Sequence, residues 1–170
     1  MKIAIIGYSG SGKSTLAEFF AEKYNIPLLY LDKIHHLPNW QEQRLDIEQK
    51  EVKNFLDNYE NWIIDGNYFK LSFERRMNEA DKIIFMNFNR FNCLFRAIKR
   101  YFKYKGKSRN SITDGCDEKL DFEFVTWILH YGRTSKKKKK YFNVIDKYKN
   151  KMIIVKNQKQ LKKLYEGQII

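Results

Sequence analysis

A glycine-rich segment near the start of the chain constrains its fold more than any other feature. Residues 2–7 (KIAIIG) form a short apolar run rich in β-branched side chains, and the segment GYSGSGKS, Gly7 to Ser14, overlaps its end. Apolar residues then recur with the period of one helix face, at Leu16, Phe19, Phe20 and Tyr24. The order strand, glycine-rich loop, helix predicts an α/β unit whose loop turns backbone N–H groups inward at a helix start.

The loop satisfies the pattern GxxxxGK[ST], which in this structural context binds nucleotide phosphates. We predict that the phosphates are bound by Gly7, Ser9, Gly10, Ser11, Gly12, Lys13, Ser14 and Thr15. Lys13 supplies a catalytic positive charge and the Ser14 hydroxyl is a candidate Mg²⁺ ligand, so ATP and Mg²⁺ are the expected cofactors. A dinucleotide-binding loop is the nearest alternative, because Asp32 stands where such folds place a ribose-binding acid. Lys13, and Thr15 in place of a third small residue, favour a triphosphate.

The rest of the chain alternates between apolar runs and helical patterns. Further strands are expected at 28–31, 62–66, 82–88 and 152–155, with helices at 45–59 and 69–80 between them. This alternation predicts a doubly wound α/β fold, a P-loop domain with a five-stranded parallel sheet and helices on both faces. The length of 170 residues predicts one domain, 1–170.

A long insertion separates the last two predicted strands, at about 90–135. Two helical patterns fill most of it, at 91–102 and 120–131, and the polar stretch 105–115 between them carries two glycines. We interpret the insertion as a helical lid and the polar stretch as a mobile loop.

Charge is distributed unevenly along the chain. The net charge is +13, and residues 90–170 hold 22 Lys and Arg against 7 Asp and Glu, whereas residues 1–89 hold 11 against 13. Two interpretations remain open: a surface for nucleic acid, or phosphate handling in a chain with a compositional drift toward lysine. The run Lys136 to Lys140 is either a solvated, self-repelling stretch or a DNA contact.

The cysteines and the longest apolar runs bear on location. Cys93 and Cys116 show no paired spacing, which favours a reducing compartment, and no run reaches the roughly 18 apolar residues that span a bilayer. Met1 leads straight into a strand, without a separate signal sequence. We expect a cytoplasmic protein without a membrane partner.

Other P-loop classes lack their signatures in this chain. The residues after the last strand, Lys156 to Gln160, contain no guanine-specifying NKxD, no LSGGQ-type segment occurs, and the chain is short for a motor or helicase. Small kinases remain. The sequence resembles the adenylate-kinase-related family known as DNA topology modulation (FlaR-like) proteins, through Gly7 to Thr15, LDKIH at 31–35 with PNW at 38–40, WIIDGNY at 62–68, and Arg96-x-x-x-Arg100. The resemblance covers the whole chain and implies a nucleoside monophosphate kinase fold with strand order 2-3-1-4-5.

The resemblance suggests roles for two acidic residues. Asp65 with Gly66 resembles the pair by which adenylate kinases place an acid near the Mg²⁺ water shell, with a simple turn as the alternative. Asp32, after the second strand, is a candidate to accept a proton from an acceptor hydroxyl or to hold the acceptor, with a helix cap as the alternative. The residues after Gly66 are Asn67, Tyr68 and Phe69 where adenylate kinases have Phe-Pro-Arg, which argues against AMP as acceptor.

Arginines in the insertion complete the candidate site. Arg96 and Arg100 lie one helical turn apart and resemble two arginines at the start of the adenylate kinase lid, with a solvated basic helix face as the alternative. Arg133 and Arg109 are further lid candidates. His35 is either a residue of the acceptor pocket or solvated, and Arg75 and Arg76 either meet an acidic acceptor or are exposed. Trp62 and Trp127 are expected in the core, and Trp40 in the core or against the acceptor.

Together these observations predict an ATP-dependent phosphotransferase, similar to adenylate kinase. It moves the γ-phosphoryl group of ATP to a small acceptor such as a nucleotide or nucleoside. The alternative is an ATP-binding, DNA-associated regulator that affects DNA topology and contacts nucleic acid through the basic half.

Overall fold

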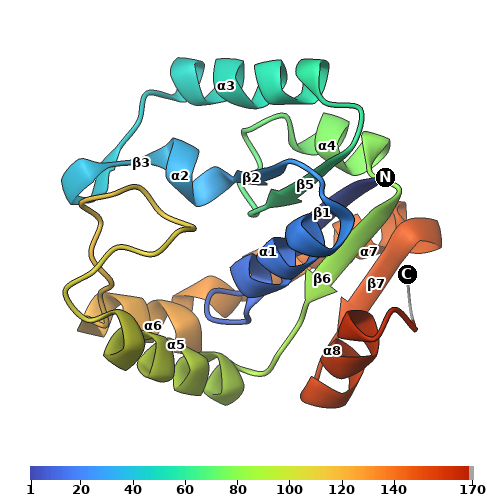
Figure 1. The fold of residues 1–170 in the computed structure, drawn as a ribbon. Coiled ribbons are helices and arrows are strands. Elements are labelled where there is room, and N and C mark those ends of the chain that lie inside the picture. The colour runs from blue at the N-terminus through green and yellow to red at the C-terminus, as the bar shows by residue number, and fades with distance from the viewer. Residues whose placement is uncertain (169–170) are drawn as a thin grey trace.

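Five parallel strands form the central sheet of the computed structural model, which describes residues 1–168. Residues 169 and 170, the end of the predicted domain, lie outside the described residues. The sheet order is β2-β5-β1-β6-β7, made by Lys2–Gly7 (β1), Leu28–Tyr30 (β2), Trp62–Asp65 (β5), Lys82–Met86 (β6) and Met152–Val155 (β7). Counted along the chain this order is 2-3-1-4-5, so the predicted fold is confirmed (Figure 1).

Helices cover both faces of this sheet, with α1 in front and α7 behind in Figure 1. The helices are Lys13–Tyr24 (α1), Leu31–His35 (α2), Leu45–Asn58 (α3), Phe73–Glu79 (α4), Arg90–Tyr104 (α5), Phe122–Leu129 (α6), Ser135–Lys147 (α7) and Gln158–Tyr165 (α8). A two-stranded antiparallel ribbon, His36–Leu37 (β3) and Gln41–Glu42 (β4), flanks a 3₁₀ turn at Pro38–Trp40, and further 3₁₀ turns lie at Tyr131–Arg133 and Lys149–Lys151. No helix within residues 1–168 has both the length and the apolar character needed to cross a bilayer.

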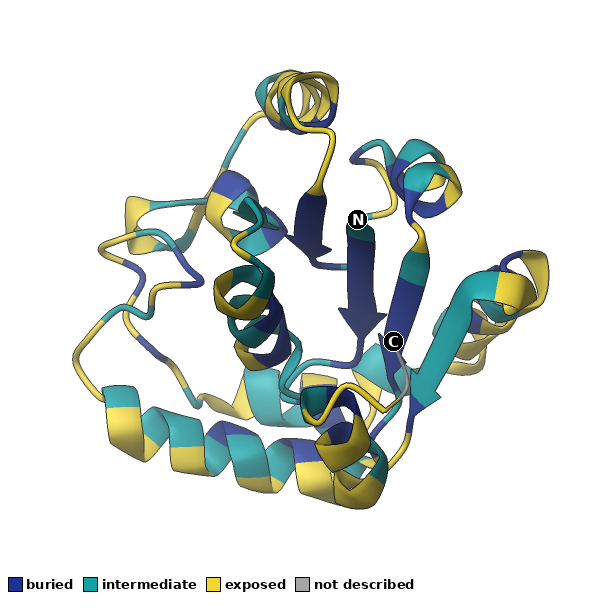
Figure 2. Ribbon diagram, turned by 45° about the vertical axis from the view of Figure 1, so that its right-hand side comes forward, coloured by how far each residue is buried: buried dark blue, intermediate teal, exposed yellow. Residues whose placement is uncertain are grey.

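The core lies in the three middle strands, which Figure 2 colours almost entirely as buried. Ile63 and Ile64 of β5, like Ile83 and Ile84 of β6, are consecutive residues whose side chains point to opposite faces, yet all four are fully buried. A parallel sheet covered on both faces needs apolar residues on both, which explains why these strands are continuous apolar runs. Each buried aliphatic side chain contributes roughly 1.5–3 kcal/mol. The core therefore fixes the carboxyl edge of the sheet, where the loops begin.

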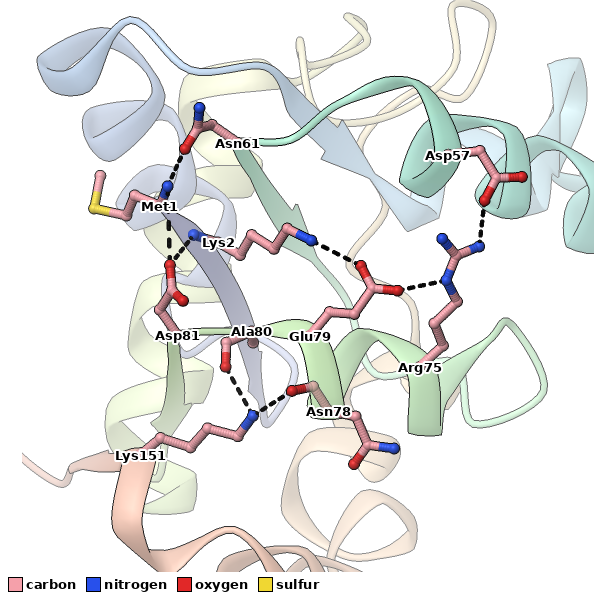
Figure 3. A network of polar contacts seen from close by, with 10 residues as sticks. All are labelled: Met1, Lys2, Asp57, Asn61, Arg75, Asn78, Glu79, Ala80, Asp81 and Lys151. Atoms are coloured by element: carbon pink, nitrogen blue, oxygen red, sulfur yellow. Dashed lines mark hydrogen bonds and ion pairs between the residues drawn. The ribbon is translucent and has the colours of Figure 1, made fainter.

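Ion pairs and hydrogen bonds tie together the amino edge of the sheet (Figure 3). Arg75 binds Asp57 at 2.7 Å and Glu79 at 2.6 Å, and Lys2 Nζ lies 2.9 Å from the other Glu79 oxygen. Lys151 donates to two carbonyl oxygens at the end of α4, 2.7 and 2.8 Å away. Arg75 thus has two carboxylate partners at the amino edge of the sheet, whereas the glycine-rich loop begins at the carboxyl edge.

Several boundaries differ from the sequence prediction, and three of these differences bear on the argument. β2 ends at Tyr30 and Leu31 begins α2, so Asp32 lies in the first turn of a helix, where an acid is favourable. α4 begins at Phe73 rather than near 69, because Ser72 has a left-handed backbone (φ 47°) that interrupts the helix. β6 ends at Met86, two residues earlier than expected.

The predicted insertion contains two neighbouring helices, α5 and α6, beyond the carboxyl ends of β1 and β6 (Figures 1 and 2). The segment between them has no helix or strand, as expected, yet it buries Ile112 and Cys116. Thr113 Oγ1 donates to the Lys33 carbonyl at 3.0 Å, and Cys116 Sγ donates to the Leu37 carbonyl at 3.1 Å. The segment is therefore anchored on the α2–β3 region rather than free.

The lysine run begins a helix. Thr134 caps α7, accepting from the Lys137 N–H at 3.4 Å, and Tyr141 and Val144 of the same helix are buried in the core. Packing of one apolar helix face supplies the stability that a lysine-rich sequence lacks on its own. The run is thus helical, and four of its five lysines are exposed to solvent, as the first of the two interpretations predicts.

Candidate active site

The glycine-rich loop connects β1 to α1 at the carboxyl edge of the sheet. Gly12 precedes the helix with φ +93°, and a Cβ on Gly10 would lie 2.5 Å from the carbonyl oxygen of Cys93 in α5. Both positions therefore require glycine. Lys13 Nζ donates to the Tyr8 carbonyl at 3.3 Å, across the loop. The loop therefore has the backbone conformation and the lysine at a helix start that the sequence predicts, and phosphate binding there stays a prediction.

The two predicted Mg²⁺ ligands meet directly. Ser14 Oγ donates to Asp65 Oδ2 at 2.6 Å, and Asp65 Oδ1 is buried and has no hydrogen-bond partner within residues 1–168. Burial raises the pKa of Asp65 to about 6, while the Lys13 charge opposes this rise. A hydroxyl and an unsatisfied carboxylate oxygen suit Mg²⁺, which prefers oxygen ligands and completes its shell with water and phosphate.

Asn67, which the sequence analysis did not assign to the site, fastens the loop to the neighbouring strand. Its Nδ2 donates to the Gly7 carbonyl and its Oδ1 accepts from the Gly7 N–H, both at 2.9 Å. These two hydrogen bonds resemble those between paired strands and join the end of β1 to the residues that follow β5. The only sequence signal for this contact is the position of Asn67 directly after Asp65-Gly66, where adenylate kinases have a different residue.

Asp32 lies at the same edge and accepts a hydrogen bond from Tyr68 Oη at 2.8 Å. Burial and the Asp32 charge raise the pKa of Tyr68, so the phenol stays a donor. His35, one turn further along α2, lies 2.6 Å from the buried Glu48 carboxylate through Nδ1. His35 therefore ties α2 to α3 and contacts the Tyr68 ring, rather than being solvated.

Arg76 is fully buried, contrary to both sequence interpretations. Its guanidinium donates to the carbonyls of Gly66, Asn67, Tyr68 and Leu71, at 2.8–3.2 Å. Burial lowers its pKa to about 9. Arg76 holds the loop after β5 in shape, and with it the residues that contact Gly7 and Asp32.

The predicted lid arginines have separate partners. Arg96 donates to the Ser11 carbonyl in the phosphate loop and stacks over Phe88, 3.9 Å from the ring centre. Arg100 instead binds Glu118 at 2.6 Å, and Arg109 binds the other Glu118 oxygen. Glu118 is almost fully buried and was not predicted. Arg96 thus contacts the candidate site, whereas Arg100 and Arg109 anchor the segment between α5 and α6.

Arg133 contacts a different part of the loop and lines a cavity of about 210 Å³. Its guanidinium stacks on Tyr8, 3.7 Å from the ring centre, and donates to the Phe88 carbonyl at 2.8 Å. Trp127 was expected in the core, but it is 42% exposed and lines this cavity, with Nε1 donating to Ser9 Oγ at 3.2 Å. Trp62 is buried as predicted, and Trp40 donates to the Asp117 carbonyl at 3.2 Å.

Comparison with known proteins supports the fold. The sequence matches no protein-family model and no curated protein. Among solved structures, deoxyadenosine kinase from M. mycoides with bound dATP is 15% identical with a TM-score of 0.56, covering 98% of each chain. The same enzyme with the products dCMP and dCDP gives 0.54 at 15% identity, again over 98% of each chain. Shikimate kinase from Bacteroides thetaiotaomicron gives 0.51 at 17% identity, over 98% of this chain and 95% of that one. The chain has the fold of small P-loop kinases.

Proposed function

We propose that this protein is an ATP-dependent phosphotransferase that moves the γ-phosphoryl group of ATP to a small acceptor. The contact of 2.6 Å between Ser14 Oγ and Asp65, beside a glycine-rich loop and Lys13, carries the proposal. Phosphoryl transfer needs positioning and charge neutralisation more than covalent chemistry from the protein. The similarity in fold to nucleoside and shikimate kinases agrees with this function.

Each predicted residue has a place in the proposal. Residues Gly7 to Thr15 bind the triphosphate, and Lys13 neutralises charge on the transferred group. When bound at Ser14 and Asp65, Mg²⁺ would neutralise charge that develops on the phosphate oxygens. Asp32 accepts the proton of the acceptor hydroxyl, and the Tyr68 hydrogen bond orients its carboxylate.

The arginines and the insertion act around this centre. Arg96 and Arg133 flank the phosphate loop on two sides, where their charges stabilise phosphate oxygens. Arg100 holds the segment through Glu118, and the insertion at about 90–135 closes over the site as a lid that excludes water.

Calorimetry and a coupled ADP assay with a panel of nucleosides, nucleoside monophosphates and small alcohols test the proposal. We expect Lys13→Ala to lose Mg-ATP binding. Asp32→Asn should keep ATP binding but lose acceptor-dependent ADP formation by at least a hundredfold. Asp46→Asn, in an exposed pair with Arg44, is the matched control and should behave as wild type. Absence of Mg-ATP binding by the wild-type protein at millimolar concentration would overturn the proposal.

A second candidate is the ATP-binding regulator of DNA implied by the resemblance to topology modulation proteins. It is favoured by Lys136, Lys138 and Lys139, which are all exposed on α7 within the basic half. In that case duplex DNA binding should weaken steeply with salt and survive Lys13→Ala, without acceptor-dependent ADP formation. Salt-independent or undetectable DNA binding excludes this candidate.

A further inference from the structure

Three cations line the cavity beside the phosphate loop, and each lies over a different aromatic ring. Arg133 lies over Tyr8 at 3.7 Å and Lys137 Nζ over Trp127 at 3.4 Å, measured to the ring centres. Lys140 Nζ lies 5.2 Å from the centre of the Phe69 ring. All six side chains belong to the cavity wall. Aromatic faces attract cations without neutralising their charge, so these rings position the cations and leave the charge available.

No carboxylate balances this charge. The cavity wall contains no Asp or Glu, and within residues 1–168 none of the three cations forms an ion pair with one. Burial, reinforced by the Lys140 charge, lowers the pKa of Lys137, which shows that its environment lacks a compensating anion. A bound anion would remove this imbalance and form charge-assisted hydrogen bonds with the lysines and the arginine.

The position and size of the cavity indicate which anion belongs there. Its wall includes Gly7, Tyr8 and Ser9 at the start of the phosphate loop but no residue from Gly10 to Thr15. The cavity therefore shares the start of the loop with the proposed donor site but does not include Lys13 or Ser14. Its volume of about 210 Å³ is below the roughly 300–1,000 Å³ of pockets that enclose a drug-sized ligand, so it suits a small charged group.

We propose that this cavity, through Lys137, Lys140 and Arg133, binds an anionic group of the phosphoryl acceptor, a carboxylate or a phosphate monoester. The inference rests on the proposed phosphotransferase function and narrows its acceptor to small anions rather than neutral nucleosides or alcohols. It also gives two lysines of the run at 136–140 a role different from that of their neighbours. Lys136, Lys138 and Lys139 do not line the cavity and face solvent.

The lysine run provides a matched pair of variants. Lys137→Ala with Lys140→Ala removes both cavity lysines, and Lys136→Ala with Lys139→Ala removes the same charge at the same spacing from the exposed side. Acceptors are compared in the ADP assay as neutral, carboxylate and phosphate forms of one skeleton: glycerol, glycerate and glycerol phosphate, and nucleosides with their monophosphates. We expect only anionic forms to be phosphorylated. The cavity variant should raise their KM at least tenfold with a smaller change in kcat, and the control variant should leave both unchanged.

A second readout tests the cavity independently of catalysis. Lys137 covers the Trp127 ring, so inorganic phosphate or acetate that draws the lysine away should change the Trp127 fluorescence. The Trp127→Phe variant keeps only Trp40 and Trp62, so a fluorescence change that it lacks comes from Trp127. We expect saturable changes in the wild type and in the control variant and none in the cavity variant, with circular dichroism confirming that all variants fold. A fluorescence change with phosphate alone indicates a site for a phosphate monoester, and a change with acetate alone indicates a site for a carboxylate.

The outcomes separate the two proposals. Mg-ATP binding without any preference for anionic acceptors, or equal effects of the two lysine variants, overturns the cavity assignment and leaves the phosphotransferase proposal standing. Absence of Mg-ATP binding overturns the phosphotransferase proposal. The assignment of the cavity as a site for the phosphoryl acceptor is then overturned as well.

Discussion

Asp65 combines two properties that conflict in the absence of a ligand. It ends a buried strand, and its burial raises its pKa from 3.8 to about 6 despite the nearby Lys13 charge. A carboxyl with a raised pKa binds its proton more tightly in the folded state. Burial of this carboxyl therefore costs the folded state little stability below about pH 4. The cost grows as the pH rises to about 6, and the folded state carries all of it at higher pH. This cost would be removed if a cation bound at Asp65, as the proposed function requires.

Asp65→Asn should accordingly stabilise the ligand-free protein at high pH while damaging nucleotide binding. A pKa shift of this size corresponds to about 1–3 kcal/mol, so we expect a gain of this order in the free energy of unfolding at pH 8 and little change near pH 4. Urea denaturation at both pH values measures the gain, and calorimetry should show at least tenfold weaker Mg-ATP binding. A variant that is destabilised at pH 8 would contradict the assignment of Asp65 as a strained ligand.

Arg76 is the other residue whose role depends on burial. Its five donors serve four carbonyls of the loop after β5, so truncation leaves those oxygens without partners. We expect Arg76→Met to lower the free energy of unfolding by about 3–5 kcal/mol, as for other buried charged groups that lose their network. Arg75→Met, the neighbouring surface position, should cost about 1 kcal/mol or less. Equal losses for the two variants, in urea denaturation, would refute this distinction.

Among the elements, the segment 105–121 shows how a loop without regular structure becomes ordered. Glu118 is buried and binds both Arg100 of α5 and Arg109 of the segment itself, which closes the segment onto the helix. Hydrogen bonds from Thr113 and Cys116 then attach it to the residues around β3. The segment therefore contacts α2, the helix that carries Asp32, and the strand that follows it, so the two regions should move together.

Glu118→Gln should release this segment without unfolding the sheet. The substitution leaves two arginines facing a neutral amide, so we expect amide hydrogen exchange over 105–119 to accelerate at least tenfold, with α1 and β1 unchanged. Glu123→Gln, at an exposed position of α6, is the control. Protection of 105–119 equal to that of the wild type would show that packing of Ile112 and Cys116, rather than the carboxylate, orders the segment.

The elements also show what the sequence could reveal. The strands were predictable because burial on both faces forces continuous apolar runs, and the phosphate loop because its glycines and lysine have fixed spacing. The start of α4 was not predictable. It depends on the left-handed backbone of Ser72 and on the hydrogen bonds that Arg76 donates to carbonyl oxygens of the preceding loop. Sequence periodicity carries no information about a partner elsewhere in the chain, which is why Asn67 and Glu118 escaped notice.

At the scale of the whole molecule, the excess positive charge opposes folding. Of 33 basic residues only some meet the 20 acidic ones, and most of the basic excess lies beyond residue 89. Exposed ion pairs contribute about 0–1 kcal/mol each, so they offset this repulsion only in part. The proposed functions would give this charge a use, because a positive field attracts both ATP and an anionic acceptor.

Ionic strength should therefore stabilise this protein, contrary to what a fold held by surface ion pairs would show. Raising KCl from about 0.01 to 0.1 M shortens the screening length from about 30 to 10 Å, which weakens repulsion across the domain more than contacts within 3–4 Å. We expect a gain of about 1 kcal/mol, or a rise in Tm of roughly 2–4 °C. Chloride is used because phosphate would bind the proposed sites. Replacing Lys136, Lys138 and Lys139 by Gln should reduce the rise, since these exposed charges contribute to the repulsion, and a fall in Tm with KCl would show that local pairs outweigh the net charge.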